Sequence, residues 1–260
     1  MVDVYVINMA KDVVKRQHMS VVCSGLQNVS FIDAVVGADL SKEEIERVYI
    51  ESEAIDAIGR PLSRGEIGCF LSHKKAYINL LSGSEDAALV LEDDVQLSVG
   101  IVSIISEVVE IKNWDIILLG HHGRSSRSTN TLVGLWGRKR LSNGRQLARP
   151  CERVMGTYGY VVSRQGAAKM LASMARIARP IDHLTGDSQR LNIYCVVEPV
   201  VTIDEAMSND HHAMHERVQL KAKKNLIAAS RPRSFLVRMA GFIGRISGRC
   251  TETIRVFLPK

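Results

Sequence analysis

Short apolar runs alternate with amphipathic stretches along the first 200 residues of the chain. The apolar runs predict strands at residues 4–7, 29–34, 87–91, 114–119, 159–163 and 195–199. Helical spacing predicts helices within 8–24, from 41, from 63, and over 98–111 and 165–177, two of them opened by Ser-x-x-Glu capping sequences at 41–44 and 63–66. Strands that alternate with helices predict an α/β fold, with a mostly parallel sheet flanked by helices.

Residues 121–150 break this pattern, because they are rich in Gly, Ser, Asn and Arg and have little periodicity. We expect a long loop with room for short strands, and long loops inside compact domains are often functional. The glycine-rich dinucleotide and phosphate-loop motifs are absent from the sequence. The nucleotide-binding classes that need those motifs are therefore disfavoured.

Three consecutive carboxylates, Glu92, Asp93 and Asp94, directly follow the apolar run 87–91. Unpaired buried charges are costly, so these side chains are expected at the carboxyl end of a central strand, where open α/β sheets bind ligands. Clustered carboxylates suit a divalent cation, and such a cation suits a phosphorylated substrate. The alternative interpretation is an acidic turn that only caps the next segment.

The chain has 260 residues, of which 46% are hydrophobic, enough for one large domain or a domain with an appendage. Its five cysteines are scattered and form no CxxC pair, which disfavours a zinc finger or a disulfide framework. No signal peptide and no membrane-spanning run are expected. These features favour a reducing, cytoplasmic setting.

Charge is distributed unevenly along the chain. Residues 217–260 carry eleven Lys and Arg against one acid, a charge of +10, and the total of +6 leaves −4 for residues 1–216. Bulky apolar residues alternate with arginine after residue 231, which is typical of an amphipathic helix on an anionic membrane surface. A terminal helix packed on the body is the alternative. Nucleic acid is not an expected partner, because the aromatic residues of a stacking platform are missing.

Several segments together resemble glycosyltransferase family 25, the lipooligosaccharide and lipopolysaccharide glycosyltransferases. They are VYVINMAKDVVKRQHM, GEIGCFLSHKKAY, ALVLEDDV, WDIILLG, GTYGYVVSRQGAAKML and PIDH, which occur in the family's order within residues 2–200. The resemblance implies a GT-A-like (Rossmann-like) domain over residues 1–216, followed by the basic tail 217–260. It also implies a nucleotide-sugar donor and a divalent cation, commonly Mn²⁺, with Mg²⁺ as the alternative.

Metal and diphosphate contacts are assigned to Asp94 first, Asp93 next and Glu92 third. A carboxylate-bound metal would stabilise the charge that develops on a departing diphosphate. The histidine-rich segment 208–215 offers His211 as a further ligand, since neutral imidazole can bind manganese or zinc. A solvated loop or the start of a helix is the alternative for that segment.

Other residues are candidates for binding the donor. The resemblance implies that Asn8 contacts the nucleotide and that Ser72 and His73 belong to the donor site. Five further residues are candidates because they lie at a helix entry, carry a basic charge or stand in a glycine-rich turn. Their alternative roles are helix capping, a solvated helix face or an ordinary turn. These candidates are Arg16, Arg64, Glu66, Gly156 and Thr157.

A general base must take the proton of the acceptor hydroxyl if the anomeric centre is inverted, as the resemblance implies. Asp182 is the first candidate and Asp187 the second, and either could instead cap a helix.

The main hypothesis is a metal-dependent glycosyltransferase that moves a hexose, with galactose as the first expectation, from a UDP-sugar to a hydroxyl of a lipid-linked lipooligosaccharide acceptor. The enzyme would be cytoplasmic and peripheral on the inner membrane through its tail. One alternative is a metal-assisted phosphoester hydrolase. Another is a non-catalytic module that binds a sugar nucleotide at the membrane.

Overall fold

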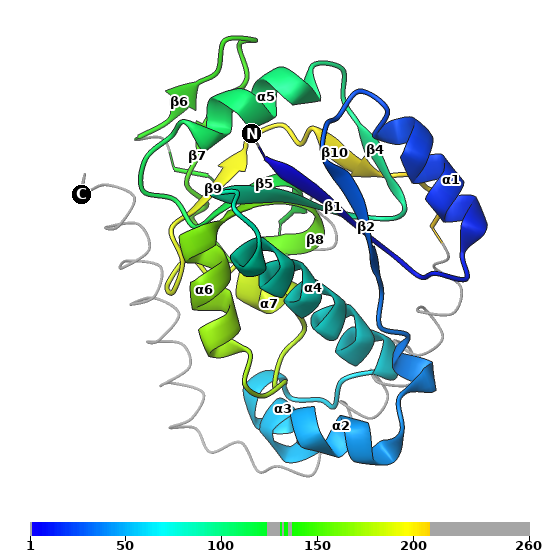
Figure 1. Ribbon diagram of the computed structural model, residues 1–260. Coiled ribbons are helices and arrows are strands. Elements are labelled where there is room, and N and C mark those ends of the chain that lie inside the picture. The colour runs from blue at the N-terminus through cyan, green and yellow to red at the C-terminus, as the bar shows by residue number, and fades with distance from the viewer. Residues whose placement is uncertain (1, 124–130, 132, 135–136, 209–260) are drawn as a thin grey trace, which may run out of the picture.

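An eight-stranded sheet is enclosed by helices in the computed structural model, which describes residues 2–123, 131, 133–134 and 137–208 (Figure 1). The strands follow the order β2-β1-β3-β8-β5-β9-β7-β6. Their bounds are β1 (Asp3–Asn8), β2 (Val29–Asp33), β3 (Ala87–Glu92), β5 (Ile116–His122), β6 (Lys139–Arg140), β7 (Gln146–Ala148), β8 (Met155–Ser163) and β9 (Ile193–Val196). A separate antiparallel pair joins β4 (Val95–Leu97) to β10 (Val201–Ile203).

Six of the strands, β2, β1, β3, β5, β9 and the two-residue β6, run in the same direction. The other two are antiparallel to them: β8 lies between β3 and β5, and β7 lies between β9 and β6. The 3₁₀ turn η1 (Gly37–Asp39) follows β2. The helices are α1 (Val13–Val22), α2 (Lys42–Val48), α3 (Glu51–Ile58), α4 (Arg64–Ser82), α5 (Ile101–Val109), α6 (Arg164–Ser173) and α7 (Asp182–Thr185). The predicted α/β architecture, a mostly parallel sheet flanked by helices, is confirmed.

Two hydrophobic cores fill the space between the sheet and its helices. Side chains of α3, α4 and α6 pack on one face, and those of α1 and α5 pack on the other. Along β3, Ala88 and Val90 face the α4 core, whereas Leu89 and Leu91 face the α1 core. Because side chains alternate along a strand, Glu92 is directed toward α4, and Asp93 toward α1.

The boundaries of some predicted elements were wrong. The helix expected over 165–177 ends at Ser173, and Ile177 instead forms a bridge with Tyr49. The late strand covers 193–196 rather than 195–199, which agrees with the inability of Pro199 to donate a ladder hydrogen bond. The sequence analysis did not anticipate α3, β4 or β10, which are short. Both predicted capping boxes, at Ser41 and Ser63, are confirmed.

Helix α4 lies unusually close to the loop that follows β2. A Cβ atom on Gly68 would stand 2.5 Å from the Val35 carbonyl oxygen and 2.7 Å from the Gly37 nitrogen, which are both backbone atoms. We expect Gly68→Ala to lower the free energy of unfolding by about 2–4 kcal/mol, because the backbone must move apart. Chemical denaturation would measure this, with Gly25→Ala as the control, since no atom lies within 4 Å of the Cβ position there. Equal stability of the two variants would contradict the close packing.

Candidate functional site

The carboxyl ends of β1 and β3 bring Asn8 beside the acidic triplet. The two strands pair in parallel, with Ile7 opposite Glu92. The fully buried Asn8 therefore donates a hydrogen bond from Nδ2 to Asp93 Oδ2 at 2.8 Å. Its Oδ1 atom is buried and has no hydrogen-bond partner among the described residues. A polar atom in that state is costly unless a ligand completes it.

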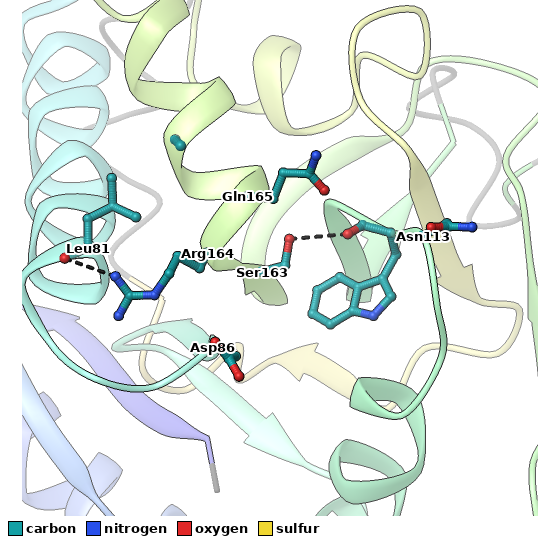
Figure 2. Close-up of a pocket in the computed structure, with 8 residues that line it drawn as sticks. Leu81, Asp86, Asn113, Ser163, Arg164 and Gln165 are labelled. Carbon is teal, nitrogen blue, oxygen red and sulfur yellow. Dashed lines mark hydrogen bonds between the residues drawn. The ribbon is translucent and has the colours of Figure 1, made fainter.

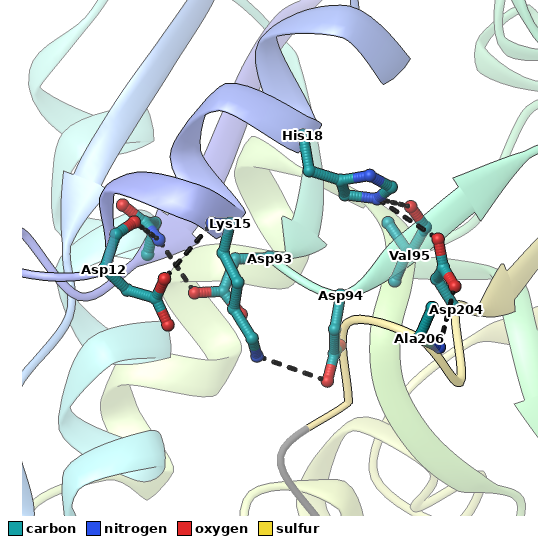
Figure 3. A network of polar contacts seen from close by, with 9 residues as sticks. Asp12, Lys15, His18, Asp93, Asp94, Val95, Asp204 and Ala206 are labelled. Atoms are coloured by element: carbon teal, nitrogen blue, oxygen red, sulfur yellow. Dashed lines mark hydrogen bonds and ion pairs between the residues drawn. The ribbon is translucent and has the colours of Figure 1, made fainter.

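Lys15 joins the two aspartates (Figure 3). Its Nζ lies 2.9 Å from Asp93 Oδ1 and 3.6 Å from Asp94 Oδ2. The side chain is only 8% exposed, because α1 packs it against the end of β3. Burial by itself would lower the pKa of Lys15, but the hydrogen bond and charge of Asp93 and the charge of Asp94 outweigh burial and raise it. Lys15 is therefore a fixed cation between two carboxylates.

Asp94 experiences an excess of negative charge. Burial, followed by the charge of Glu92, raises the pKa of Asp94 from 3.8 to about 6, although Lys15 opposes the shift. A group with such a raised pKa in a site of like charges is a candidate for binding a cation. The chain turns at Asp93 and Asp94, so both side chains reach Lys15.

Glu92 makes a separate set of contacts on the α4 side. Its Oε1 accepts a hydrogen bond from the Thr157 hydroxyl at 2.9 Å and lies 3.6 Å from His73 Nε2. Burial would raise the pKa of Glu92, but the interactions with His73, Thr157 and Lys15 outweigh burial and lower it. Glu92 is therefore held as a carboxylate, and its side chain contacts groups that differ from those around Asp93.

A buried chain of hydrogen bonds supports His73. Its Nδ1 lies 2.8 Å from the Tyr160 hydroxyl, which in turn lies 2.7 Å from the Tyr77 hydroxyl. All three side chains are fully buried. The Nε2 atom of His73 has no hydrogen-bond partner among the described residues. The imidazole is thus fixed in position with its second nitrogen directed toward Glu92.

Several predicted donor residues are engaged by the protein itself. Ser72 accepts a hydrogen bond from the Val35 backbone at 2.8 Å and donates one to the Gly68 carbonyl at 2.7 Å. Arg64 donates to the carbonyls of Ala38 and Leu40. These contacts join α4 to the loop after β2, which gives both residues a structural role. Their predicted part in donor binding stays a prediction.

The alternative roles of Glu66 and Arg16 are visible in the structure. Glu66 completes the capping box with Ser63 and accepts two hydrogen bonds from Arg60, at 2.8 and 2.6 Å. Arg16 lies over the Phe31 ring, at 4.5 Å from its centroid, and is 3.8 Å from Asp33. Within the described part of the chain, no hydrogen bond or ion pair joins Arg16 to the acidic triplet. The donor roles of both residues stay predictions.

Gly156 and Thr157 open β8 next to Glu92. Gly156 has φ of +101°, which strains other residues, and a Cβ there would lie 2.7 Å from the Tyr158 ring. The backbone conformation therefore explains why glycine stands at position 156. It also directs the next residue, Thr157, to the hydrogen bond with Glu92.

The two candidate bases lie in different surroundings. Asp182 opens α7, which packs against β8, the strand that carries Thr157 to its hydrogen bond with Glu92. Asp187 accepts a hydrogen bond from the Gln189 backbone and lines a small pocket with residues of α6. The structure therefore brings Asp182, rather than Asp187, toward the groups around Glu92.

The strand β10 carries the chain back to the acidic turn. The backbone nitrogen of Asp204 donates to the Asp94 carbonyl at 2.7 Å, and its side chain accepts a bond from Gln96 and lies 3.7 Å from His18 (Figure 3). His211 lies outside the described residues, as does the rest of 209–260. His211 follows Asp204 by seven positions, a reach of at most ~25 Å.

One pocket of the described residues is at the other end of the sheet (Figure 2). It has a volume of about 720 Å³ and is lined by residues that include Asp86, Trp114 and Ser163. Asp86 and Trp114 precede β3 and β5, and Ser163 ends the antiparallel β8, so these residues mark the amino-terminal edge of the parallel strands. This pocket is thus separate from the acidic turn.

The acidic turn fits a divalent cation. Asp93 and Asp94 supply the oxygen ligands that hard cations prefer, and Lys15 already occupies the position of a positive charge between them. A bound cation would stabilise the charged form of Asp94, and a bound ligand would supply the missing partner of Asn8 Oδ1.

Lys15, Cys69 and Asp204 were not singled out from the sequence. Only the position of Lys15 on the helix after β1 could have indicated it.

Comparisons with known proteins agree with this geometry. The sequence profile described as glycosyltransferase family 25 (LPS biosynthesis protein) matches residues 1–185. The chain belongs to glycosyltransferase family 25. This family assignment confirms the resemblance found in the sequence.

Among curated members of family 25 or its relatives, a glycosyltransferase 25 family member of Aedes aegypti is 27% identical over 151 residues, which are 55% of this chain and 23% of the relative. Procollagen galactosyltransferase 1-B of Xenopus laevis is 28% identical over 190 residues, which are 65% of this chain and 28% of the relative. The chain thus spans about a quarter of the length of these relatives. The solved galactosyltransferase LgtC, in complex with donor and acceptor sugar analogues, aligns with 89% of this chain and 97% of its own at 11% identity, with a TM-score of 0.33, too low to inform on function.

Proposed function

We propose that this chain is a metal-dependent glycosyltransferase that transfers a hexose from a UDP-sugar to a hydroxyl of a lipid-linked lipooligosaccharide acceptor. Galactose is the hexose that we expect first. The observation that carries the proposal is the pair Asp93 and Asp94, bridged by Lys15 at the carboxyl ends of β1 and β3. Support for galactose comes from the procollagen galactosyltransferases, and support for the acceptor comes from the family description.

In this proposal Asp94 and Asp93 hold the cation, for which Mn²⁺ is expected first and Mg²⁺ second. When bound, the cation would neutralise charge on the departing diphosphate. Glu92, ranked third in the sequence, instead contacts Thr157 and His73. His211 is therefore the proposed further ligand, since it follows closely after Asp204, whose backbone is bonded to Asp94. Asn8 Oδ1 is available to accept a hydrogen bond from the nucleotide, because it is buried without a partner in the described chain.

Acceptor activation is assigned to Asp182. A base must lie within hydrogen-bond reach of the acceptor hydroxyl, directly or through one water. Asp182 acts electrostatically on Cys69 and Arg60, whereas Asp187 is used in a local turn against α6. Asp187 therefore remains the second candidate.

A donor screen tests the reaction. The purified chain would be incubated with several UDP-sugars and truncated lipooligosaccharide acceptors, with Mn²⁺, Mg²⁺ or EDTA, and the products read by mass spectrometry. We expect hexose addition that requires both the acceptor and the cation. Release of sugar phosphate without acceptor would instead favour the phosphoester hydrolase, and tight UDP binding without turnover would favour the binding module.

The basic tail is proposed to dock the enzyme peripherally on an anionic, cytoplasmic membrane face. No helix of the described residues is long and apolar enough to cross a bilayer, and the tail itself lies outside them. We expect the full chain to bind anionic vesicles in a salt-sensitive manner, and a 1–230 form to lose most of that binding, because seven of the eleven basic residues of 217–260 lie after residue 230. Co-sedimentation would measure this, and equal binding by both forms would contradict the proposal.

A further inference from the structure

A cluster of one sulfur, one nitrogen and one oxygen donor lies on the α4 side of the site. Cys69 and His73 are four residues apart on α4, so they share one face of the helix. Glu92 approaches the same face from the end of β3. The three donor atoms lie within 4.8 Å of one another.

The imidazole of His73 is the most informative member of this cluster. It is fully buried, yet its Nε2 has no hydrogen-bond partner among the described residues. A buried polar atom without a partner is costly, so it indicates a missing ligand. The carboxylate oxygen Oε1 of Glu92 lies 3.6 Å from this nitrogen.

The outer contacts of the cluster resemble those of metal sites. Metal-binding histidines usually donate their second ring N–H to an acceptor, which fixes the tautomer. His73 Nδ1 lies 2.8 Å from the Tyr160 hydroxyl, which can accept that proton while donating its own to Tyr77. In that arrangement the Nε2 lone pair is directed into the cluster. Thr157 holds the Glu92 carboxylate in place at 2.9 Å.

The chemistry of the donors separates this cluster from the aspartate pair. Thiolate and imidazole favour Zn²⁺ and similar cations, whereas carboxylates alone favour Mg²⁺ or Mn²⁺. Tetrahedral Zn²⁺ with bonds of 2.0–2.3 Å needs donor atoms about 3.4–3.7 Å apart. The His73–Glu92 distance already meets this requirement. Because all three donor atoms lie within 4.8 Å of one another, Cys69 needs to move by at most about 1 Å.

We propose that Cys69, His73 and Glu92 form a second metal site, which binds a Zn²⁺-class cation independently of the Asp93–Asp94 pair. Binding forms bonds from Sγ, Nε2 and a carboxylate oxygen to the cation, and the Cys69 thiol releases its proton to solvent. Water completes the fourth position.

Cobalt(II) is the direct probe, because it replaces zinc in tetrahedral sites and absorbs light when a thiolate binds it. The full chain, kept reduced, would be titrated with Co²⁺ and then with Zn²⁺. We expect one equivalent of a thiolate-to-cobalt charge-transfer band, which Zn²⁺ abolishes. Cys69→Ser is expected to remove the band, and His73→Gln to weaken binding by ~100-fold or more, since loss of an outer contact alone costs 10–100-fold.

Three variants serve as controls. Cys151→Ser should retain the band, because Cys151 is not part of the cluster. Asp93→Asn and Asp94→Asn should also retain it, which separates this site from the proposed transferase metal site. A wild-type chain that takes up no Co²⁺ or Zn²⁺, or a band that survives in Cys69→Ser, would overturn the proposal.

Alkylation provides a test that needs no variant. Cys69 is partly exposed, so iodoacetamide modification can be followed by peptide mass spectrometry with and without Zn²⁺. We expect Zn²⁺ to slow modification of Cys69 at least tenfold while leaving that of Cys151 unchanged. An unchanged rate at Cys69 would contradict the site regardless of how the variants fold.

Discussion

Asp94→Asn is expected to abolish sugar transfer while raising the stability of the metal-free protein at neutral pH. The transfer is lost because the first-ranked ligand of the proposed cation is removed, and losing one charge-stabilising group typically costs 10²–10³ in kcat. The stability increases because Asp94 is held beside Asp93 and Glu92 in partly buried surroundings that disfavour its charge. Asparagine keeps the shape of the side chain without that charge.

The sign of the pH dependence follows from the direction of the shift. Folding raises the pKa of Asp94 from 3.8 to about 6, so the folded state binds its proton more tightly than the unfolded state. The resulting stability is fully present below pH 3.8 and is lost as the pH rises through 6. Above that pH the ionised side chain costs up to ~3 kcal/mol. Part of this cost is recovered in the variant.

Thermal unfolding in EDTA would measure the effect. We expect the melting temperature of Asp94→Asn to exceed that of the wild type by roughly 2–8 °C at pH 7.5 and by little at pH 4.5. Mn²⁺ should stabilise the wild type and not the variant, because only the wild type binds it. Glu46→Gln, at an exposed carboxylate on α2, is the matched control and should change neither property. Full activity of Asp94→Asn would contradict the metal assignment.

The sequence predicts well which polar residues lie at the carboxyl ends of the strands. The apolar run 87–91 has to be a buried strand, so the following acids have to emerge at its carboxyl end. Parallel pairing then brings Asn8 to the same edge, and the structure shows it bonded to Asp93. The side of the sheet on which each acid lies was less predictable. Glu92 and Asp94 were expected on one side, but the turn brings Asp94 to Lys15 instead.

Tertiary contacts explain why other residues were harder to interpret. Ser72 looks polar and available in the sequence, yet α4 is packed so closely on the loop after β2 that the Val35 nitrogen bonds its hydroxyl. Cys69 looks isolated, because only the helix period and the end of β3 bring it to His73 and Glu92. The histidines of 208–215 lie outside the described residues, and the role of His211 stays a prediction.

Lys15→Met is expected to separate two effects of the same positive charge. In the metal-free protein the Lys15 ammonium neutralises Asp93 and Asp94, so it competes with any cation for their oxygens. Removing it should therefore tighten Mn²⁺ binding in the absence of donor by about tenfold or more, since a unit charge about 4 Å away is worth about 1 to 4 kcal/mol near a protein surface. Isothermal titration with Mn²⁺ would measure this.

Turnover should change in the opposite direction. In our proposal the ammonium displaced by the cation is left next to the diphosphate, where it stabilises the charge of the leaving group, so Lys15→Met should lower kcat by ~10²–10³. Lys15→Arg should recover part of the activity, and Lys42→Met, at a side chain that is 79% exposed, should be neutral. If Lys15→Met instead weakened Mn²⁺ binding as much as it slowed transfer, Lys15 would act only by holding the two carboxylates in place. Tighter metal binding together with slower transfer is the result that requires a direct role for its charge.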